Sequence, residues 1–217
     1  MKITAVKTAA SVGHCLHLWV RIETDAGITG LGECVHGGTA AIALIHHLRP
    51  ELVGRDPFQI DAIFEDLRRR YVFEGGFAGA FITALPGIEI ALWGLKGKAL
   101  GVPVYALLGG KFRDKIRLSE CRKIANLAET YYIPFAPHNV ASPIGSLASA
   151  HVCATIPNFL VLEFHWLHRD YWTTIIREKE NIIHDGYITL TDRPGIGLDL
   201  DETVARQYQW PGTTWFE

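Results

Sequence analysis

Histidine is the side chain of this sequence with the widest chemical scope, because it transfers protons and binds metal ions near neutral pH. The chain has ten histidines, and six of them form close pairs: His14 with His17, His46 with His47, and His165 with His168. Residues three apart can share one face of a helix and bind a metal together. No pair, however, has a third ligand or a glutamate at HExxH spacing. We therefore expect these pairs to lie at the surface or in packing positions.

Composition excludes several other classes of function. The net charge of -2 gives no footprint for nucleic acid, and the glycines and lysines of residues 94–98 lack the GxxxxGK[ST] spacing of a phosphate loop. No run approaches the roughly 18 apolar residues that span a membrane, and the N-terminus lacks the apolar region of a signal peptide. The four cysteines show no CxxC pair. These features favour a reduced, cytoplasmic protein without a nucleic-acid or membrane partner.

The first half of the chain reads as strands followed by helices. Residues 3–9, 17–24 and 28–34 alternate like strands, and Asp25-Ala26-Gly27 supplies hairpin-turn chemistry. Helical periodicity then begins at Thr39 and is predicted to end before Pro50. A second helix opens at Asp56-Pro57 and ends at three arginines, and a third runs over 81–100 with a kink or a fresh start at Pro86. This order indicates an α+β domain.

The second half alternates helices with short apolar strands. A helix over 122–131 precedes a strand over 133–136, and a helix from Ser142-Pro143, with His151 in its register, precedes a strand over 159–164. Strands that are apolar on both faces and alternate with helices indicate parallel β/α units, and two units do not close a barrel. The tail reads as an extended arm with a short helix over 201–208. Trp166, Trp172, Trp210 and Trp215 are expected to pack between arm and cap.

Four sequence blocks resemble one family, the mandelate racemase branch of the enolase superfamily, and within it the galactonate/gluconate type of acid-sugar dehydratase. Residues 88–110 are similar to the family's linker between capping domain and barrel. Residues 122–139 look like its sixth barrel helix and seventh strand, residues 157–163 look like the eighth strand, and residues 192–197 match the C-terminal arm. The blocks occur in family order and span most of the chain.

The resemblance implies a mechanism and two site residues. In the family, Mg²⁺ held by three carboxylates binds the substrate carboxylate, a base removes the adjacent proton, and an acid expels the next hydroxyl group as water. By its place in the motif, His138 resembles the general base at the end of strand seven. Glu163 resembles the glutamate of strand eight that hydrogen-bonds the enediolate. The plainer alternatives are a polar loop histidine and a carboxylate that caps a strand end.

The sequence also departs from the family pattern. After residues 115–118, which look like strand one, the chain continues directly with the helix that follows strand six. About 75 residues match barrel segments, against about 250 in a typical barrel, so roughly 175 are missing. The three metal carboxylates, the acid of strand six and the basic residues of strand two have no counterpart. Lys111, Arg113 and Lys115 belong to the linker and strand one and cannot replace them.

The sequence therefore predicts an α+β capping domain joined to a truncated α/β barrel of TIM type. We place the capping domain at 1–112, residual barrel segments at 113–185 and the arm that returns to the cap at 186–217. Two functions stay open. One is a Mg²⁺-dependent sugar-acid dehydratase. The other is an inactive, internally deleted remnant that does not bind Mg²⁺ and acts at most as a folded or oligomerising module. The parallel strand edges left open predict a homo-oligomer or another self-associated form.

Overall fold

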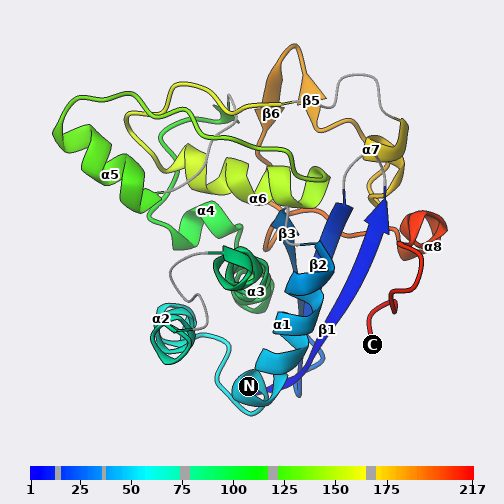
Figure 1. Cartoon of the computed structure of the whole chain (residues 1–217). Coiled ribbons are helices and arrows are strands. Elements are labelled where there is room, and N and C mark those ends of the chain that lie inside the picture. Colours follow the sequence, from blue (N-terminus) through cyan, green and yellow to red (C-terminus); the bar gives the residue numbers. More distant parts are fainter. Residues whose placement is uncertain (13–15, 36–37, 74–78, 117–121, 165–169) are drawn as a thin grey trace. The chain divides into compact units, whose positions relative to one another are not determined.

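The chain folds into two units, which are described separately (Figure 1). Unit 1 comprises residues 1–99 and 202–217, and unit 2 comprises residues 100–201. The computed structural model describes residues 1–12, 16–35, 38–73, 79–116, 122–164 and 170–217.

An antiparallel meander forms the sheet of unit 1. Its strands β1 (Ile3–Val12), β2 (Leu16–Thr24) and β3 (Thr29–Val35) pair in the order β1-β2-β3. The turn between β2 and β3 places Gly27 at a φ of 71°, which glycine adopts without steric cost, and its N–H donates to the Thr24 carbonyl at 3.1 Å. The sequence-based prediction of three short antiparallel strands is thus confirmed.

Three helices share a hydrophobic core with this sheet: α1 (Gly38–Leu52), α2 (Ile60–Arg70) and α3 (Gly79–Leu100). The backbones of β3 and α3 approach closely because glycine lies at the contact. A Cβ added at Gly32 would come within 2.0 Å of the Gly87 carbonyl oxygen, and one added at Gly30 within 1.9 Å of the Ala91 carbonyl oxygen. The glycines of β3 are therefore required by packing.

The predicted helix boundaries need three corrections. The first helix does not end before Pro50 but continues to Leu52, because Leu52 is fully buried in the core and Pro50 lies only in the last turn. The second begins at Ile60 rather than at Asp56, whose carboxylate instead accepts from the Phe58 N–H at 2.9 Å. The third is one helix through Pro86, so a fresh start there is wrong, whereas the alternative of a kink stays a prediction.

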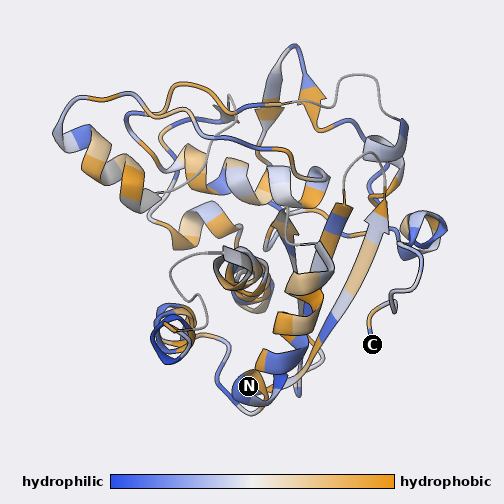
Figure 2. Cartoon of the chain, in the orientation of Figure 1, coloured by the Kyte–Doolittle hydropathy of each residue, from blue (hydrophilic) through white to orange (hydrophobic). Residues whose placement is uncertain are grey.

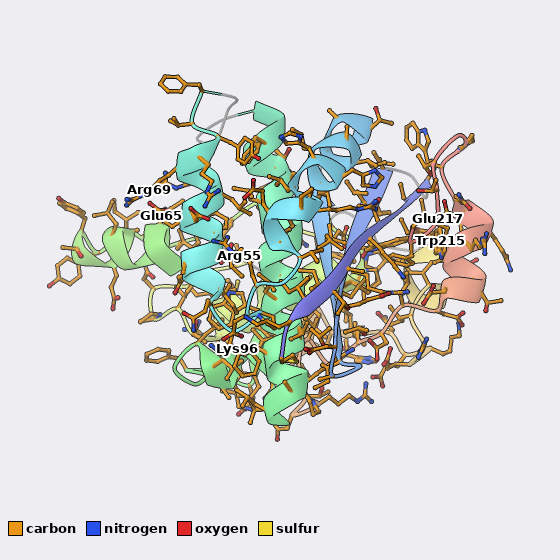
Figure 3. All side chains as sticks on the ribbon, turned by 90° about the horizontal axis from the view of Figure 1, so that it is seen from below. Arg55, Glu65, Arg69, Lys96, Trp215 and Glu217 are labelled. Carbon is orange, nitrogen blue, oxygen red and sulfur yellow. The ribbon has the colours of Figure 1, made fainter. Side chains whose placement is uncertain are left out.

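Charged side chains of α2 pair with one another at the surface (Figure 3). Glu65 accepts from Arg68 at 2.8 Å and from Arg69 at 2.7 Å, and Asp66 accepts from Arg70 at 2.9 Å. These hydrogen bonds hold the pKa of the Glu65 carboxyl at about 2, well below its ordinary value. The three arginines therefore form a solvated helix end, as their position in the sequence indicates.

The last residues of the chain return to the sheet of unit 1. After α8 (Glu202–Ala205) and the 3-10 helix η1 (Arg206–Tyr208), Trp215 forms a bridge with Ala9 of β1. Its ring meets Trp19 edge-on, with centroids 6.0 Å apart, and Figure 3 shows Trp215 beside the strands. Arg21 of β2 binds Glu202 at 2.5 Å. The segment 202–217 thus covers part of the sheet.

Unit 2 is built around α6 (Pro143–Ala154), most of whose residues are buried. The other elements are short: α4 (Val104–Leu107), β4 (Lys115–Ile116), α5 (Arg122–Thr130), α7 (Asp170–Thr174), β5 (Ile183–His184) and β6 (Tyr187–Thr189). The residues that resemble barrel strand one pair antiparallel with β6 in a sheet of order β4-β6-β5. Within the described residues, no helix is long and apolar enough to cross a membrane.

Candidate functional site

Two parallel extended segments bring the two predicted site residues together. Phe135 and Phe159 form a parallel bridge, in which the Phe135 N–H donates to the Asn158 carbonyl and the Leu160 N–H donates to the Phe135 carbonyl, each at 2.9 Å. The sequence predicts full strands here, whereas only this bridge forms. Pro134 and Pro137 explain the difference, because proline has no N–H for a ladder. His138 and Glu163 follow at the same end of both segments.

The side chains of His138 and Glu163 face each other at this end. His138 Nε2 lies 3.6 Å from Glu163 Oε2, and the two side chains are 63% and 37% exposed. At this distance the two groups form an ion pair when the histidine is protonated. Exposure to water weakens such a pair. The arrangement can therefore exchange protons with a ligand that approaches from solvent.

Asn139 holds the Glu163 end of the site, although sequence reasoning did not single it out. Its backbone N–H donates to Glu163 Oε2 at 3.1 Å, and its side-chain Nδ2 donates to the Glu163 carbonyl at 3.3 Å and to Ser146 Oγ at 3.1 Å. The side chain of Ser142 caps α6 by accepting from the Ile144 N–H at 3.2 Å. The available sequence signals were the Pro-His-Asn turn and the Ser-Pro helix start.

His151 of α6 has a structural role in unit 2. Its side chain is 1% exposed. Its Nδ1 accepts from the Tyr105 N–H at 3.3 Å, so Nε2 carries the proton and donates to the Ile196 carbonyl at 3.0 Å. Burial lowers the pKa of His151 to about 4, and the bond to the Ile196 carbonyl opposes this shift. The neutral ring thus joins three segments of unit 2 at neutral pH.

The basic residues of the linker have structural partners. The Arg113 guanidinium donates to the carbonyls of Cys153, Ile156 and Pro157 at 3.3, 2.8 and 3.2 Å, which places a positive charge at the C-terminal end of α6. Lys111 binds Asp114 at 2.7 Å. That neither residue replaces the family's basic pair stays a prediction from the sequence.

A metal centre has no ligand set in the described part of the chain. Residues 1–12, 16–35, 38–73, 79–116, 122–164 and 170–217 contain no group of three or more His, Cys, Asp or Glu side chains that could hold a metal ion. His138 and Glu163 are only two such groups, and each is occupied by the contacts given above. The residues described do not fit a magnesium site of the family type.

Three further histidines, all in unit 1, have contacts within that unit. His17 lies in the sheet of unit 1 with Nδ1 3.0 Å from the buried Glu33 carboxylate, and His46 Nε2 lies 2.8 Å from the Thr8 hydroxyl. Burial lowers the pKa of His46, and nearby Arg49 adds to this shift. His47 meets the Tyr71 ring edge-on. His14, His165 and His168 lie outside the described residues.

The prediction for the tryptophans is confirmed for Trp215 and wrong for Trp172. Trp172 is buried within unit 2, where it meets Phe164 edge-on and donates from Nε1 to the Ala141 carbonyl at 3.3 Å. Trp210 packs against the core of unit 1. Trp166 and the junction between residues 118 and 119 lie outside the described residues.

Comparison with family models covers most of the chain. The model described as the mandelate racemase / muconate lactonizing enzyme N-terminal domain matches residues 2–109, and the model described as enolase C-terminal domain-like matches residues 118–204. Both descriptions agree with the resemblance drawn from the sequence blocks.

Similar proteins include two kinds of sugar-acid dehydratase. The D-xylonate dehydratase of Haloferax volcanii is 25% identical over 376 residues, covering 100% of this chain and 91% of that enzyme. The D-galactonate dehydratase of Verminephrobacter eiseniae is 44% identical over 119 residues, covering 54% of this chain. The chain spans 30% of the length of that galactonate dehydratase.

Solved structures show the same fold. A mandelate racemase/muconate lactonizing enzyme-like protein from Rubrobacter xylanophilus is 26% identical with a TM-score of 0.92, and the match covers 99% of each chain. A mandelate racemase/muconate lactonizing enzyme from Sulfitobacter sp. is 18% identical with a TM-score of 0.83, covering 100% of this chain and 98% of that one. The capping-domain-plus-barrel fold is thereby supported.

Proposed function

Because the chain belongs to the mandelate racemase/muconate lactonizing enzyme branch of the enolase superfamily, we propose that it derives from a sugar-acid dehydratase. The observation that carries this proposal is the meeting of His138 and Glu163, 3.6 Å apart at the same end of two parallel segments. Relatives named D-xylonate and D-galactonate dehydratase support a sugar acid as the ligand class. We propose no particular sugar acid, because the strand ends that would select it have no counterpart in this chain.

The retained pair supplies proton-transfer chemistry. A neutral His138 Nε2 can accept the proton from the carbon next to a carboxylate, and a protonated Glu163 can donate a hydrogen bond to the oxygen that becomes negative. The 3.6 Å separation allows both groups to reach one ligand. Mg²⁺ in the family stabilises the charge of the enediolate, and the described residues offer no site for it. The pair alone therefore lacks the larger electrostatic contribution.

We infer that the chain by itself is a catalytically inactive remnant with an internal deletion. The alignment with the Haloferax volcanii enzyme extends over 376 residues, which exceeds the 217 residues of this chain by 159. Since the alignment covers all of this chain, the excess positions lie opposite gaps within it. A loss of this size agrees in magnitude with the roughly 175 barrel residues missing from the sequence pattern.

Magnesium calorimetry on the purified chain, with dehydration assays on a panel of six-carbon and five-carbon sugar acids, tests this inference. We expect neither Mg²⁺-dependent heat nor turnover. Turnover that requires Mg²⁺, disappears in His138→Gln and survives in His184→Gln would refute the remnant and establish a dehydratase. The control residue His184 lies exposed at the end of β5 in the same unit.

A specific observation also favours self-association of the remnant. Apolar residues recur along α5 and the segments beside it (Figure 2), and eight large apolar side chains among the described residues of unit 2 are more than half exposed. They are Leu100, Phe112, Ile124, Leu127, Tyr131, Tyr132, Ile133 and Leu160. Exposed apolar surface of this kind promotes association. The edge of the segment 133–137 contributes less, because its two prolines offer no N–H donors.

Sedimentation velocity over a range of concentrations tests the association. We expect the wild-type chain to form dimers or larger species, and the double variant Leu127→Lys/Leu160→Lys to sediment as a smaller species. Val53→Lys, at an exposed apolar position of unit 1, is the matched control and should leave the distribution unchanged. A monodisperse wild-type monomer would refute this proposal.

A further inference from the structure

Asn139 is a buried amide between the two site residues and helix α6. Its side chain is 5% exposed, and its N–H groups donate to Glu163 Oε2, to the Glu163 carbonyl and to Ser146 Oγ. Ser146 is itself fully buried, and its hydroxyl donates to the Ala141 carbonyl at 3.4 Å. The amide is therefore fixed by a helix that belongs to the core of unit 2.

Three hydrogen bonds join residues 137–139 to Glu163. The Glu163 N–H donates to the Pro137 carbonyl at 3.3 Å, and the Glu163 carbonyl accepts from Asn139 Nδ2 at 3.3 Å. The carboxylate itself accepts from the Asn139 backbone N–H at 3.1 Å. A glutamate side chain has three rotatable bonds and is otherwise free to swing into solvent. These contacts restrict it to the conformation that faces His138.

We propose that Asn139 is a positioning residue that sets the distance between the Glu163 carboxylate and the His138 imidazole. It does so by two routes at once, since its side chain anchors the main chain of Glu163 and its main chain anchors the carboxylate. Both routes depend on the bond from Nδ2 to Ser146, which fixes residue 139 to α6. The proposal rests on the proposed function only in that it treats His138 and Glu163 as an acid–base pair.

The geometry separates this role from simple support of α6. Ser142 caps the same helix by accepting from the Ile144 N–H at 3.2 Å, a contact that supports the start of α6. Loss of the cap and loss of the Asn139 side chain should each destabilise the start of α6 to a similar degree. Only the second should uncouple the carboxylate from the imidazole. Ser142→Ala is therefore the matched control for Asn139→Ala.

The experiment measures the interaction of the pair directly by NMR of the ¹³C,¹⁵N-labelled full chain. The intensity of the nuclear Overhauser effect between the Glu163 side-chain methylene protons and the His138 ring protons measures the coupling of the two side chains. The same intensity is then recorded in Asn139→Ala and Ser142→Ala. This effect falls steeply with distance, so release of the carboxylate from its 3.6 Å approach to the ring should remove most of the coupling.

We expect Asn139→Ala to reduce the coupling in this way and Ser142→Ala to leave it within error of the wild type. Equal coupling in all three backgrounds, or an equal loss in both variants, would overturn the proposal. If Asn139→Ala does not fold, Ser146→Ala removes only the anchor of the amide and should give a partial loss. An unchanged coupling in a folded Ser146→Ala chain would likewise overturn it.

This readout is independent of turnover. A chain without dehydratase activity but with coupling that depends on Asn139 would refute the enzyme function and retain the positioning role. Turnover in a chain whose coupling does not depend on Asn139 would retain the enzyme function and refute the positioning role.

Discussion

The buried His151 makes a strong prediction about the pH dependence of stability. In the folded chain its pKa lies at about 4, whereas an unperturbed histidine in the unfolded chain has a pKa of about 6.5. The unfolded state therefore binds a proton between these two values while the folded state does not. Stability is fully present above pH 6.5, falls as the pH drops from 6.5 to 4, and changes no further below pH 4.

The magnitude follows from the gap between the two pKa values. One pKa unit corresponds to about 1.4 kcal/mol, so lowering the pH from 7 to 5 should remove about 2 kcal/mol of stability through His151 alone. The ring is almost fully buried, so little solvent screening applies. The change equals a substantial share of the stability of an ordinary domain.

The assay compares the wild type with His151→Gln, which cannot titrate in this range. Urea unfolding at pH 5, 6 and 7 gives the free energy of unfolding of each protein, and hydrogen exchange of the α6 amides locates the effect in unit 2. Other groups titrate in both proteins and cancel in the difference. We expect the wild type to lose about 2 kcal/mol more than the variant between pH 7 and pH 5.

A second non-titrating variant, His151→Leu, controls for the choice of substitution. It should be less stable than His151→Gln at pH 7, because it leaves the Tyr105 N–H and the Ile196 carbonyl without partners, yet it should show the same pH dependence relative to the wild type. A difference between wild type and variants that is constant from pH 5 to pH 7 would refute the reasoning.

Two further predictions concern buried and capping charges. Arg113→Ala should lower the melting temperature of unit 2, at a cost of about 1 to 2 kcal/mol, because three carbonyls at the end of α6 lose a charged donor; Arg113→Lys should restore part of it, and an unchanged melting curve would contradict the capping role. Glu33→Ala should destabilise unit 1 by about 1 to 3 kcal/mol in urea titrations, because the buried His17 ring loses the carboxylate that lies 3.0 Å from its Nδ1. Glu33→Gln, which retains an acceptor, should cost less, and equal stability of both variants and the wild type would refute the importance of this pair.

Local patterns were sufficient for elements whose signal lies within a few residues. The Asp25-Ala26-Gly27 turn predicted the hairpin that Gly27 closes with its φ of 71°, and the Ser142-Pro143 start predicted the capped helix α6. The sequence-based prediction for α1 was wrong, because it placed the end of the helix before Pro50. Burial of Leu52, fixed by the core of unit 1, outweighs the hydrogen bond that proline removes.

At the candidate site, proline prevents strand pairing that the sequence pattern predicts. The apolar runs over 133–136 and 159–164 predicted two parallel strands, and the structure retains their parallel approach but forms a single bridge. The missing N–H groups of Pro134 and Pro137 could have been read from the sequence. The bond from Asn158 Nδ2 to the Ile133 carbonyl, at 2.8 Å, could not, because it joins residues 25 apart.

By itself the sequence determined the family of this chain, because a motif preserves residue type and order along the chain. It also predicts two site residues, and it predicts that the metal ligands are missing because no block of the sequence resembles the segments that carry them in the family. Only the tertiary structure decided how the residues present are held. The contact of Asn139 with Glu163, the two hydrogen bonds of His151 and the pairing of β4 with β6 all join residues far apart in sequence. Such contacts depend on the path of the whole chain and on burial, and no local pattern encodes either.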